Sequence, residues 1–575
     1  MQLIRLKLLS EFRSLSPDFE IKFSQEPVPA ELDQLISPIC LVGKNGTGKS
    51  NTLELLCEIF FYLDSLLLNY PSESLLAKKQ FGFELEYKFN VVEGETYETW
   101  IDKKFQWSNT ERHVKVVKSP NEEGPVYYLV DSNEQPSAVQ RTKDTLREVK
   151  EKVKKLLPNK VIGYSSGLNE LISNPFLKMQ FHYFHEYQKR LEEYVLDGFE
   201  DGSLFFMNYE SNAAVVVANF LMQHEKKLAV LDDTLEISGL ESFRIVIEQG
   251  NFFDVDSDAR ANEEKVDILT YFTKEIQFLK QISTTQKETT YTDNSTTEQK
   301  KVLTLDYKIT SATKAAFRHF FGDTYTLYSI FHRMHLLNIY KIPEEKRTRI
   351  LNAFSGMNIS DILPTLSADQ LLFRIEKIKL IKSKTNKIVH YKNISDGEHQ
   401  FMHIVGTSMI MNQNKTIFIL DEPETHFNPK WRSKYVNTIN KVEKAEVLVM
   451  QENNQERVKN PVEMVLTTHS PFILSDSYRN KIWKFSKENG QLVHDLIGIN
   501  TYGTSFSILL EDAFDKMETI SEMSFEFIES LKRDLVSIQD IESAQDQLRL
   551  LGDSTEKIFL LNYLVEKRRK IENAN

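Results

Sequence analysis

The sequence contains few of the residues that mark secreted or membrane proteins. Only two of its 575 residues are cysteine, Cys40 and Cys57, and both stand in apolar segments. We expect reduced core cysteines, and a disulfide framework is excluded. The longest apolar candidate for a membrane span, residues 213–222, contains Asn219 and is far shorter than the roughly 20 residues that a spanning helix needs. No membrane association is therefore predicted.

The N-terminus lacks the basic region and unbroken apolar core of a signal peptide. Residues 1–12 alternate apolar and polar residues instead, which predicts a strand and a cytoplasmic protein. Excess positive charge is also missing, because the net charge is −12, so nucleic-acid binding would require local basic patches. The length exceeds the roughly 250 to 300 residues at which single cores stop growing. We expect at least two domains, or one domain with large insertions.

The most specific pattern in the sequence is GKNGTGKS at residues 43–50. It follows an apolar strand at 39–42 and precedes a helix that starts near Ser50. A loop of small residues can point its backbone N–H groups at a triphosphate, and the helix N-terminus adds a favourable dipole. We expect Lys49 to contact the β- and γ-phosphates and Ser50 to bind Mg²⁺. The predicted nucleotide-binding residues here are Gly43, Lys44, Asn45, Gly46, Thr47, Gly48, Lys49, Ser50 and Thr52.

A second apolar strand ends in two acidic residues, within TIFILDEPETHFNP at 416–429. In an open α/β sheet the carboxyl end of this strand would place Asp421 and Glu422 beside the phosphate loop. One acid can hold Mg²⁺, which we assign to Asp421. The other can orient or deprotonate an attacking water, and this predicts Glu422 as a catalytic residue together with Lys49.

Two shorter patterns each have a structural and a functional interpretation. ISDGEHQ at 394–400 predicts a helix start, with Ser395 as the N-cap and Glu398 completing a capping box. The same helix end, with Gly397, could bind a phosphate of a nucleotide held by a second copy. LTTHSP at 466–471 places His469 at the end of another apolar strand, where a histidine is more often structural.

Together these motifs, in this order, resemble the ABC ATPase family. The resemblance assigns Walker A to 43–50, the signature to 394–400, Walker B to 416–422, the D-loop to 425–429 and the switch histidine to His469. FRSL at 12–15 and PETHFNP at 423–429 are similar to the SMC-like and RecF-like branch. Within it, VIGYSSG (161–167), YESNAAVVVANFL (209–221) and GINTYGTSF (498–506) resemble bacterial anti-phage ATPases of the overcoming-lysogenization, Septu, retron-associated and restriction-associated types.

The resemblance implies an α/β fold: an ABC ATPase head with a mixed sheet core, an antiparallel β subdomain and a large helical insertion. It implies ATP and Mg²⁺ as cofactors, held between Walker A of one subunit and the signature of another. The chain would then form a homodimer or higher homo-oligomer through its heads. Glu422 would activate water, His469 would sense the γ-phosphate, and Ser395, Gly397 and Glu398 would complete the site of the second copy.

The implied function is a slow ATPase that acts as sensor or regulator of an anti-phage complex and gates a separate effector, a nuclease or toxin. The last hundred residues lack an Asp-x-Asp pair at a strand end, and no other nuclease motif is found, so a nuclease would be a separate polypeptide. The alternatives are a RecF-like DNA-repair ATPase and a scaffold held together by nucleotide.

The sequence divides into four predicted parts. Residues 1–168 form the N-terminal ATPase lobe, whose antiparallel β subdomain contains the alternating segments FELEYKF, ETYETWI, HVKVV and VYYLV. Residues 169–370 form a mainly helical insertion with a flexible loop near 283–300. Residues 371–505 form the C-terminal ATPase lobe, and 506–575 form a helical tail. Aromatic residues near the start of the insertion are interpreted as core: Phe176, Phe181, Tyr183, Phe184 and Tyr187.

Two basic segments are candidates for DNA or RNA binding. The predicted helix at 141–160 carries eight basic and three acidic residues, and we favour a solvated helix face there. Residues 372–392 predict a hairpin with one lysine-rich face, carrying seven basic residues and one acidic residue. For this hairpin, nucleic-acid binding and simple solvation remain open.

Overall fold

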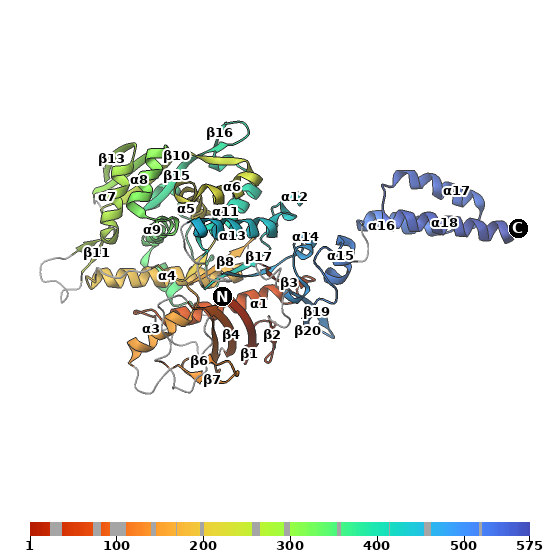
Figure 1. Cartoon of the computed structure of the whole chain (residues 1–575), viewed down its shortest axis with the longest axis horizontal. Coiled ribbons are helices and arrows are strands. Elements are labelled where there is room, and N and C mark those ends of the chain that lie inside the picture. Colours follow the sequence, from red (N-terminus) through yellow and green to blue (C-terminus); the bar gives the residue numbers. More distant parts are fainter. Residues whose placement is uncertain are drawn as a thin grey trace.

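The computed structural model shows a mixed α/β protein built around a seven-stranded, a six-stranded and a five-stranded sheet (Figure 1). It describes residues 1–23, 37–72, 82–91, 100, 111–139, 145–167, 170–195, 201–255, 265–292, 299–353, 358–412, 415–452, 462–516 and 520–574. Within these residues, none of the helices has both the length and the apolar character needed to cross a membrane.

The seven-stranded sheet forms the centre of the molecule, with strand order β20-β19-β3-β18-β17-β8-β9. Its strands are β3 (Ile39–Gly43), β8 (Lys160–Ser165), β9 (Leu204–Phe206), β17 (Thr416–Asp421), β18 (Val462–Thr467), β19 (Ile482–Glu488) and β20 (Gln491–Leu496). All neighbours are parallel except β19 and β20. Every residue of β3 and β17 is buried, as expected for parallel strands that are covered on both faces.

Alternate residues of the central strands enter two different hydrophobic cores. Ile417 and Ile419 of β17 belong to a core with helix α1 (Lys49–Ser65) and the six-stranded sheet. Phe418 and Leu420 belong to the other core, with α5 (Tyr209–Met222), α11 (Asp396–Ile410) and α13 (Tyr435–Glu452). The period of two along a strand therefore places α1 and α11 on opposite faces of the sheet (Figure 1).

The six-stranded antiparallel sheet lies beside α1 and has the order β2-β1-β4-β5-β6-β7. Its strands are β1 (Gln2–Leu8), β2 (Glu20–Lys22), β4 (Phe83–Asn90), β5 (Glu111–Lys118), β6 (Val126–Val130) and β7 (Pro136–Ala138). Three of the four alternating segments predicted for this sheet are confirmed as β4, β5 and β6. The fourth, ETYETWI, lies outside the described residues apart from Trp100.

The insertion contains more strand than its sequence predicted. A five-stranded antiparallel sheet joins β13 (Thr285–Thr292), β14 (Gln299–Lys308), β10 (Ile237–Gln249), β15 (Phe373–Lys382) and β16 (Ile388–His390) in this order. The β15–β16 pair confirms the predicted hairpin. Pairing of β10 with β15 also means that the domain boundary predicted at residue 370 cuts through this sheet.

The prediction of a flexible loop near 283–300 is wrong for residues 285–292, which form β13. This strand pairs with β14 over its whole length, and residues 293–298 lie outside the described part of the chain. Its described side chains are exposed, so the apolar alternation that marks a half-buried strand is absent. Backbone pairing at a sheet edge and β-branched threonines stabilise it instead.

The remaining elements up to residue 475 belong to the N-terminal lobe (α3), to the insertion and to the C-terminal lobe. The helices are α3 (Leu146–Leu156), α4 (Glu170–Glu192), α6 (Glu225–Leu235), α7 (Thr273–Ile282), α8 (Ser311–Phe321), α9 (Thr324–Leu336), α10 (Glu344–Leu351), α12 (Pro429–Arg432) and α14 (Pro471–Ser475), with a short pair of strands, β11 (Phe252–Asp254) and β12 (Lys265–Asp267). The aromatic residues of α4 are confirmed as core: four are at most 3% exposed and Tyr183 is partly buried. Helix α3 occupies the middle of the predicted basic helix at 141–160.

The described residues of the C-terminal segment form four α-helices. Helix α15 (Phe506–Phe514) packs on α14, with the rings of Phe506 and Phe472 4.5 Å apart. Helices α16 (Glu522–Lys532), α17 (Ile538–Gln547) and α18 (Thr555–Ala574) extend away from the rest of the molecule and have a small core of their own (Figure 1). Two apolar residues on α18 are largely exposed, Ile558 at 59% and Phe559 at 65%.

The packing of β8 against α4 gives a prediction about stability. A Cβ atom added at Gly163 would lie 2.3 Å from the Phe176 ring, so Gly163→Ala should overpack the core and lower the free energy of unfolding by about 1 to 3 kcal/mol. Urea unfolding measures this change. Gly124→Ala is the matched control, because nothing lies within 4 Å of the added Cβ. Equal stability of both variants would contradict the packing described here.

Candidate functional site

The loop between β3 and α1 has a backbone that requires glycine. Gly43, Gly46 and Gly48 have φ angles of 131°, 76° and 89°, which L-residues rarely adopt. A Cβ at Gly43 would also lie 2.1 Å from the Phe485 carbonyl oxygen. Helix α1 begins at Lys49 without a side-chain cap. Its first N–H groups are therefore suited to bind an anion.

Lys49 bends back over this loop. Its Nζ donates hydrogen bonds to the carbonyl oxygens of Gly43 and Lys44, both at 2.9 Å, and the residue is 6% exposed. Burial lowers the pKa of the Lys49 ammonium, and the nearby carboxylates of Glu422 and Asp421 oppose this effect. The loop thus holds a buried cation whose protein partners are neutral carbonyls.

The structure brings Ser50 and Asp421 together although 371 residues separate them in the chain. Ser50 Oγ lies 3.3 Å from Asp421 Oδ1, and the same carboxylate oxygen accepts a hydrogen bond of 2.6 Å from Thr467 Oγ1. Asp421 is 7% exposed. Its carboxylate is therefore held in place at the carboxyl edge of the parallel strands, facing the start of α1.

Glu422 and His469 lie next to this pair at the ends of β17 and β18. Glu422 has φ 47°, and its N–H donates to the Thr467 hydroxyl at 3.1 Å. Its Oε1 lies 3.6 Å from His469 Nε2, with both side chains more than a third exposed. Burial, and then the charge of Lys49, lower the pKa of the His469 imidazole. A neutral ring is therefore favoured at neutral pH.

The other predicted loop residues have mixed positions. Lys44, Asn45 and Gly46 are exposed, and Thr47 donates a hydrogen bond of 2.8 Å to the Lys44 carbonyl. Thr52 is fully buried, and its hydroxyl donates to the Gly48 carbonyl at 3.1 Å within α1. The Thr52 side chain thus supports the helix start.

The predicted signature lies at the N-terminus of α11 on the opposite face of the sheet. The capping box is confirmed: the Glu398 N–H donates to Ser395 Oγ, and the Ser395 N–H donates to the Glu398 carboxylate. A Cβ at Gly397 would lie 2.7 Å from the His426 carbonyl oxygen, so α11 approaches the segment after β17 closely. Glu398 also pairs with Lys382 at 2.7 Å. These contacts do not involve the loop at 43–50.

Gln400, one turn further along α11, joins three segments of the site region. Its Nε2 donates to the Tyr164 hydroxyl at 2.6 Å and to the Pro423 carbonyl at 2.8 Å. Its Oε1 accepts a bond of 3.2 Å from the His426 N–H. Gln400 is the last residue of the predicted signature, but its bridging role was missed, because nothing in the local pattern separates a bridging glutamine from any other helix residue.

Two residues from the C-terminal tail reach the site, which the sequence did not indicate. Asp515, directly after α15, pairs with Lys44 of the loop at 3.3 Å and with Lys484 at 2.7 Å. The ring of Phe514 lies 5.6 Å from the ring of His469. Only the packing of α15 on the central sheet creates these contacts, so no sequence signal could have found them.

The donor set fits Mg²⁺ bound together with phosphate better than a metal held by protein alone. Among the described residues there is no group of three or more His, Cys, Asp or Glu residues that could hold an ion. The Ser50 hydroxyl and the Asp421 carboxylate supply two oxygen ligands instead. Mg²⁺ commonly takes one or two protein oxygens and completes its shell with water and substrate phosphates.

Glu424 is a buried acid that the sequence analysis included only within the PETHFNP pattern at 423–429. It is 4% exposed and accepts a hydrogen bond from Thr468 Oγ1, and burial raises the pKa of its carboxyl group to about 7. The protonated form is therefore favoured from about pH 4.5 to about pH 7, where an exposed glutamate would be charged. A protonated carboxyl can remain in this apolar position at lower cost than a carboxylate.

The raised pKa of Glu424 predicts a pH-dependent stability. The pKa of Glu424 is 4.5 in the unfolded chain and about 7 in the folded protein. Between these two pH values the folded protein keeps a proton that the unfolded chain has lost, so the free energy of unfolding should fall as pH rises through this window. From pH 5 to pH 8 the Glu424 contribution should fall by about 2 to 3 kcal/mol. Urea unfolding of wild type and Glu424→Gln at both pH values measures this loss, which the glutamine should abolish. The exposed Glu488→Gln serves as control, and an unchanged pH dependence in Glu424→Gln would contradict the assignment.

Comparison with known proteins does not assign the site to a family. A scan against protein-family models gives no match, and a search among curated proteins gives none. The chemistry of the site therefore rests on its own residues.

Proposed function

We propose that this chain is an ABC-type ATPase. The observation that carries the proposal is the contact of Ser50 with Asp421 at 3.3 Å, beside a glycine loop whose lysine is buried. An anion-binding loop, two oxygen ligands for Mg²⁺ and an accessible carboxylate then share one edge of the sheet. This combination suits the transfer of a phosphoryl group to water.

Each residue has a chemical role in this proposal. Lys49 would exchange its two carbonyl partners for phosphate oxygens, a stronger charge-assisted contact. Ser50 and Asp421 would hold Mg²⁺, which neutralises phosphate charge. Glu422 would accept a proton from the attacking water, and the neutral His469 beside it would donate a hydrogen bond toward the reacting phosphate.

A second copy of the chain would complete the site. Ser395 and Gly397 lie at the N-terminus of α11, on the sheet face opposite α1. One chain thus presents a phosphate loop and a separate helix N-terminus that could meet a neighbour's loop. Two heads arranged head to tail would bury two nucleotides between them. ATP binding would then close the pair and hydrolysis would release it, a two-state element that can gate a partner.

The proposed biological role is regulation of an anti-phage complex with a separate effector, a nuclease or toxin. The motif resemblance supports it, and so does the extension formed by α16, α17 and α18. Other side chains of α18 are buried in the small core of this extension. Ile558, Phe559 and further apolar side chains on two turns of the same helix are exposed, which is typical of a surface that another protein covers.

A RecF-like DNA-repair ATPase is the second candidate. The lysine-rich β15–β16 hairpin is the feature that favours it, because basic side chains can bind the DNA backbone. Two of its lysines already have acidic partners: Lys382 pairs with Glu398 and Lys384 with Glu236. Lys377 and Lys387 are exposed. The hairpin therefore offers less free positive charge than its sequence suggested. A nucleotide-held scaffold is the third candidate.

Two substitutions test the ATPase. Lys49→Ala removes the cation of the loop and should abolish ATP binding. Glu422→Gln keeps the shape but cannot accept a proton, so it should bind ATP while hydrolysis falls at least about 100-fold. Equilibrium binding of labelled ATP and phosphate release measure the two effects. Normal turnover by Glu422→Gln would overturn the assignment of the base, and normal ATP binding by Lys49→Ala would overturn the site.

The partner is tested by isolating tagged Glu422→Gln protein with ATP from the native host. A stoichiometric nuclease or other toxic enzyme is expected if the chain gates an effector. Recovery of DNA alone would favour the repair ATPase. In that case the double variant Lys377→Ala, Lys387→Ala should lose the DNA, while an equally charged change on α3, Lys152→Ala with Lys154→Ala, should retain it. DNA binding unaffected by the hairpin change would exclude a DNA role for the hairpin.

A further inference from the structure

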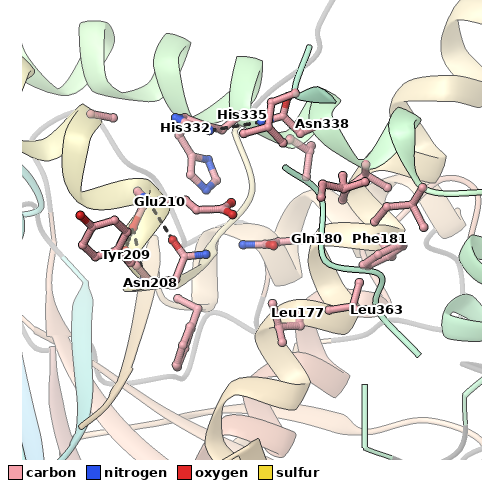
Figure 2. A pocket seen from close by; sticks show the side chains of 18 of the residues that line it. Leu177, Gln180, Phe181, Asn208, Tyr209, Glu210, His332, His335, Asn338 and Leu363 are labelled. Carbon is pink, nitrogen blue, oxygen red and sulfur yellow. Dashed lines mark hydrogen bonds between the residues drawn. The ribbon is translucent and has the colours of Figure 1, made fainter. Parts of the chain in front are cut away.

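The insertion contains a cavity of about 460 Å³ that the proposed ATPase mechanism does not use (Figure 2). Helices α4, α5 and α9, the 3-10 turn at Leu337–Lys341 and the segment at 363–371 line it, and it is open to solvent on one side. Its volume lies in the range of small-molecule sites, about 300 to 1,000 Å³. Apolar and aromatic side chains form much of its wall, among them Leu177, Phe181, Phe206, Ile339, Leu363 and Leu366.

Four polar side chains direct their end groups toward the middle of this cavity: Gln180, Asn208, Glu210 and His332 (Figure 2). Asn208 caps α5, and its Oδ1 accepts the Ser211 N–H at 2.8 Å. Its amide NH₂ group is thereby oriented. The side chains come from three different helices or their ends, so the convergence is a product of the tertiary fold.

Among the described residues that line the cavity, Glu210 supplies the one carboxylate. Glu210 is exposed as a residue, yet protein atoms around its carboxyl group desolvate it and raise its pKa. Among the described residues that line the cavity there is no lysine or arginine. A phosphate group would therefore meet a carboxylate without a compensating cation, whereas N–H donors would satisfy it.

We propose that this cavity binds a flat, uncharged molecule that presents two adjacent N–H donors, as the edge of a guanine base does. The two oxygens of Glu210 accept from the two donors, and the amides of Gln180 and Asn208 bond the remaining polar atoms of the ring. Phe181 and Phe206 provide aromatic surface against the ring system. The cavity has room for a nucleoside, and the absence of lysine and arginine from its described lining residues selects against a nucleotide.

The same turn of α5 that lines the cavity also contacts the predicted signature helix α11. The rings of Tyr209 and His399 lie 5.6 Å apart, and Ser211 Oγ lies 3.2 Å from His403 Nε2. Asn212 Nδ2 donates to the His399 carbonyl at 3.2 Å. Tyr209 and Ser211, the neighbours of Glu210 in the chain, therefore contact α11, so a ligand bound to Glu210 would lie next to the residues that position this helix. On the proposed ATPase function, the bound ligand changes the rate of ATP turnover through α11.

Calorimetric titration of guanosine into the full-length Lys49→Ala protein tests the cavity. Guanosine has no phosphate, and the variant lacks the lysine of the loop, so binding at the proposed ATP site should not contribute to the signal. Saturable binding with one site per chain is expected. Glu210→Gln should raise the dissociation constant at least about tenfold, the cost of one charge-assisted hydrogen bond. The matched control Glu225→Gln, exposed on the neighbouring helix α6, should bind as the parent does. Adenosine, which lacks the adjacent donors, should bind at least about tenfold more weakly than guanosine.

Three outcomes would overturn the proposal. Absence of guanosine binding would exclude the guanine-type ligand, and equal binding by the Glu210→Gln variant would place the ligand elsewhere. Binding of arginine amide in preference to guanosine would show that the carboxylate takes a guanidinium instead of a base. The link to α11 is tested separately in wild type: guanosine should change steady-state ATP hydrolysis, and this effect should vanish in Glu210→Gln. Guanosine binding without ATP hydrolysis by the wild type would refute the ATPase function and leave the cavity assignment standing.

Discussion

The site depends on the register of three parallel strands. Strands β3 and β17 are not neighbours, because β18 lies between them and pairs with both. Thr467 at the end of β18 is opposite Asp421 on one side and Leu41 on the other, and its hydroxyl holds the Asp421 carboxylate at 2.6 Å. A shift of one residue in the pairing of β17 with β18 would turn the Asp421 side chain to the other face of the sheet and away from Ser50.

This arrangement concentrates buried charge in a small volume. Lys49, Asp421 and Glu424 are all less than 9% exposed, and a buried ionised group is costly unless it has partners. The three residues meet this requirement in different ways: Lys49 bonds two carbonyls, Asp421 accepts from two hydroxyls, and Glu424 favours its protonated form below about pH 7. The Lys49 ammonium is the buried positive charge of the loop, and a bound phosphate would give it a charged partner in place of the two carbonyls.

Features fixed by neighbouring residues were predictable from the sequence. The glycine loop, the capping box at Ser395 and the buried strands β3 and β17 each depend on a short stretch of chain, and each was found. The features that were missed depend on contacts between distant segments. Asp515 reaches Lys44 only because α15 packs on the central sheet, and β13 exists only because β14 offers it an edge. Local patterns contain no information about either contact.

The insertion and the C-terminal tail contact different parts of the proposed composite site. The insertion contacts α11 through α5, next to the N-terminus that would face a second copy's nucleotide. The C-terminal tail contacts the phosphate loop and His469 through Asp515 and Phe514. In a head-to-tail pair, each nucleotide would therefore lie between the loop of one chain, with its tail, and the signature of the other, with its insertion. A signal received by the insertion of one copy would then act on the nucleotide bound by its neighbour, so regulation through the cavity would require the assembled pair.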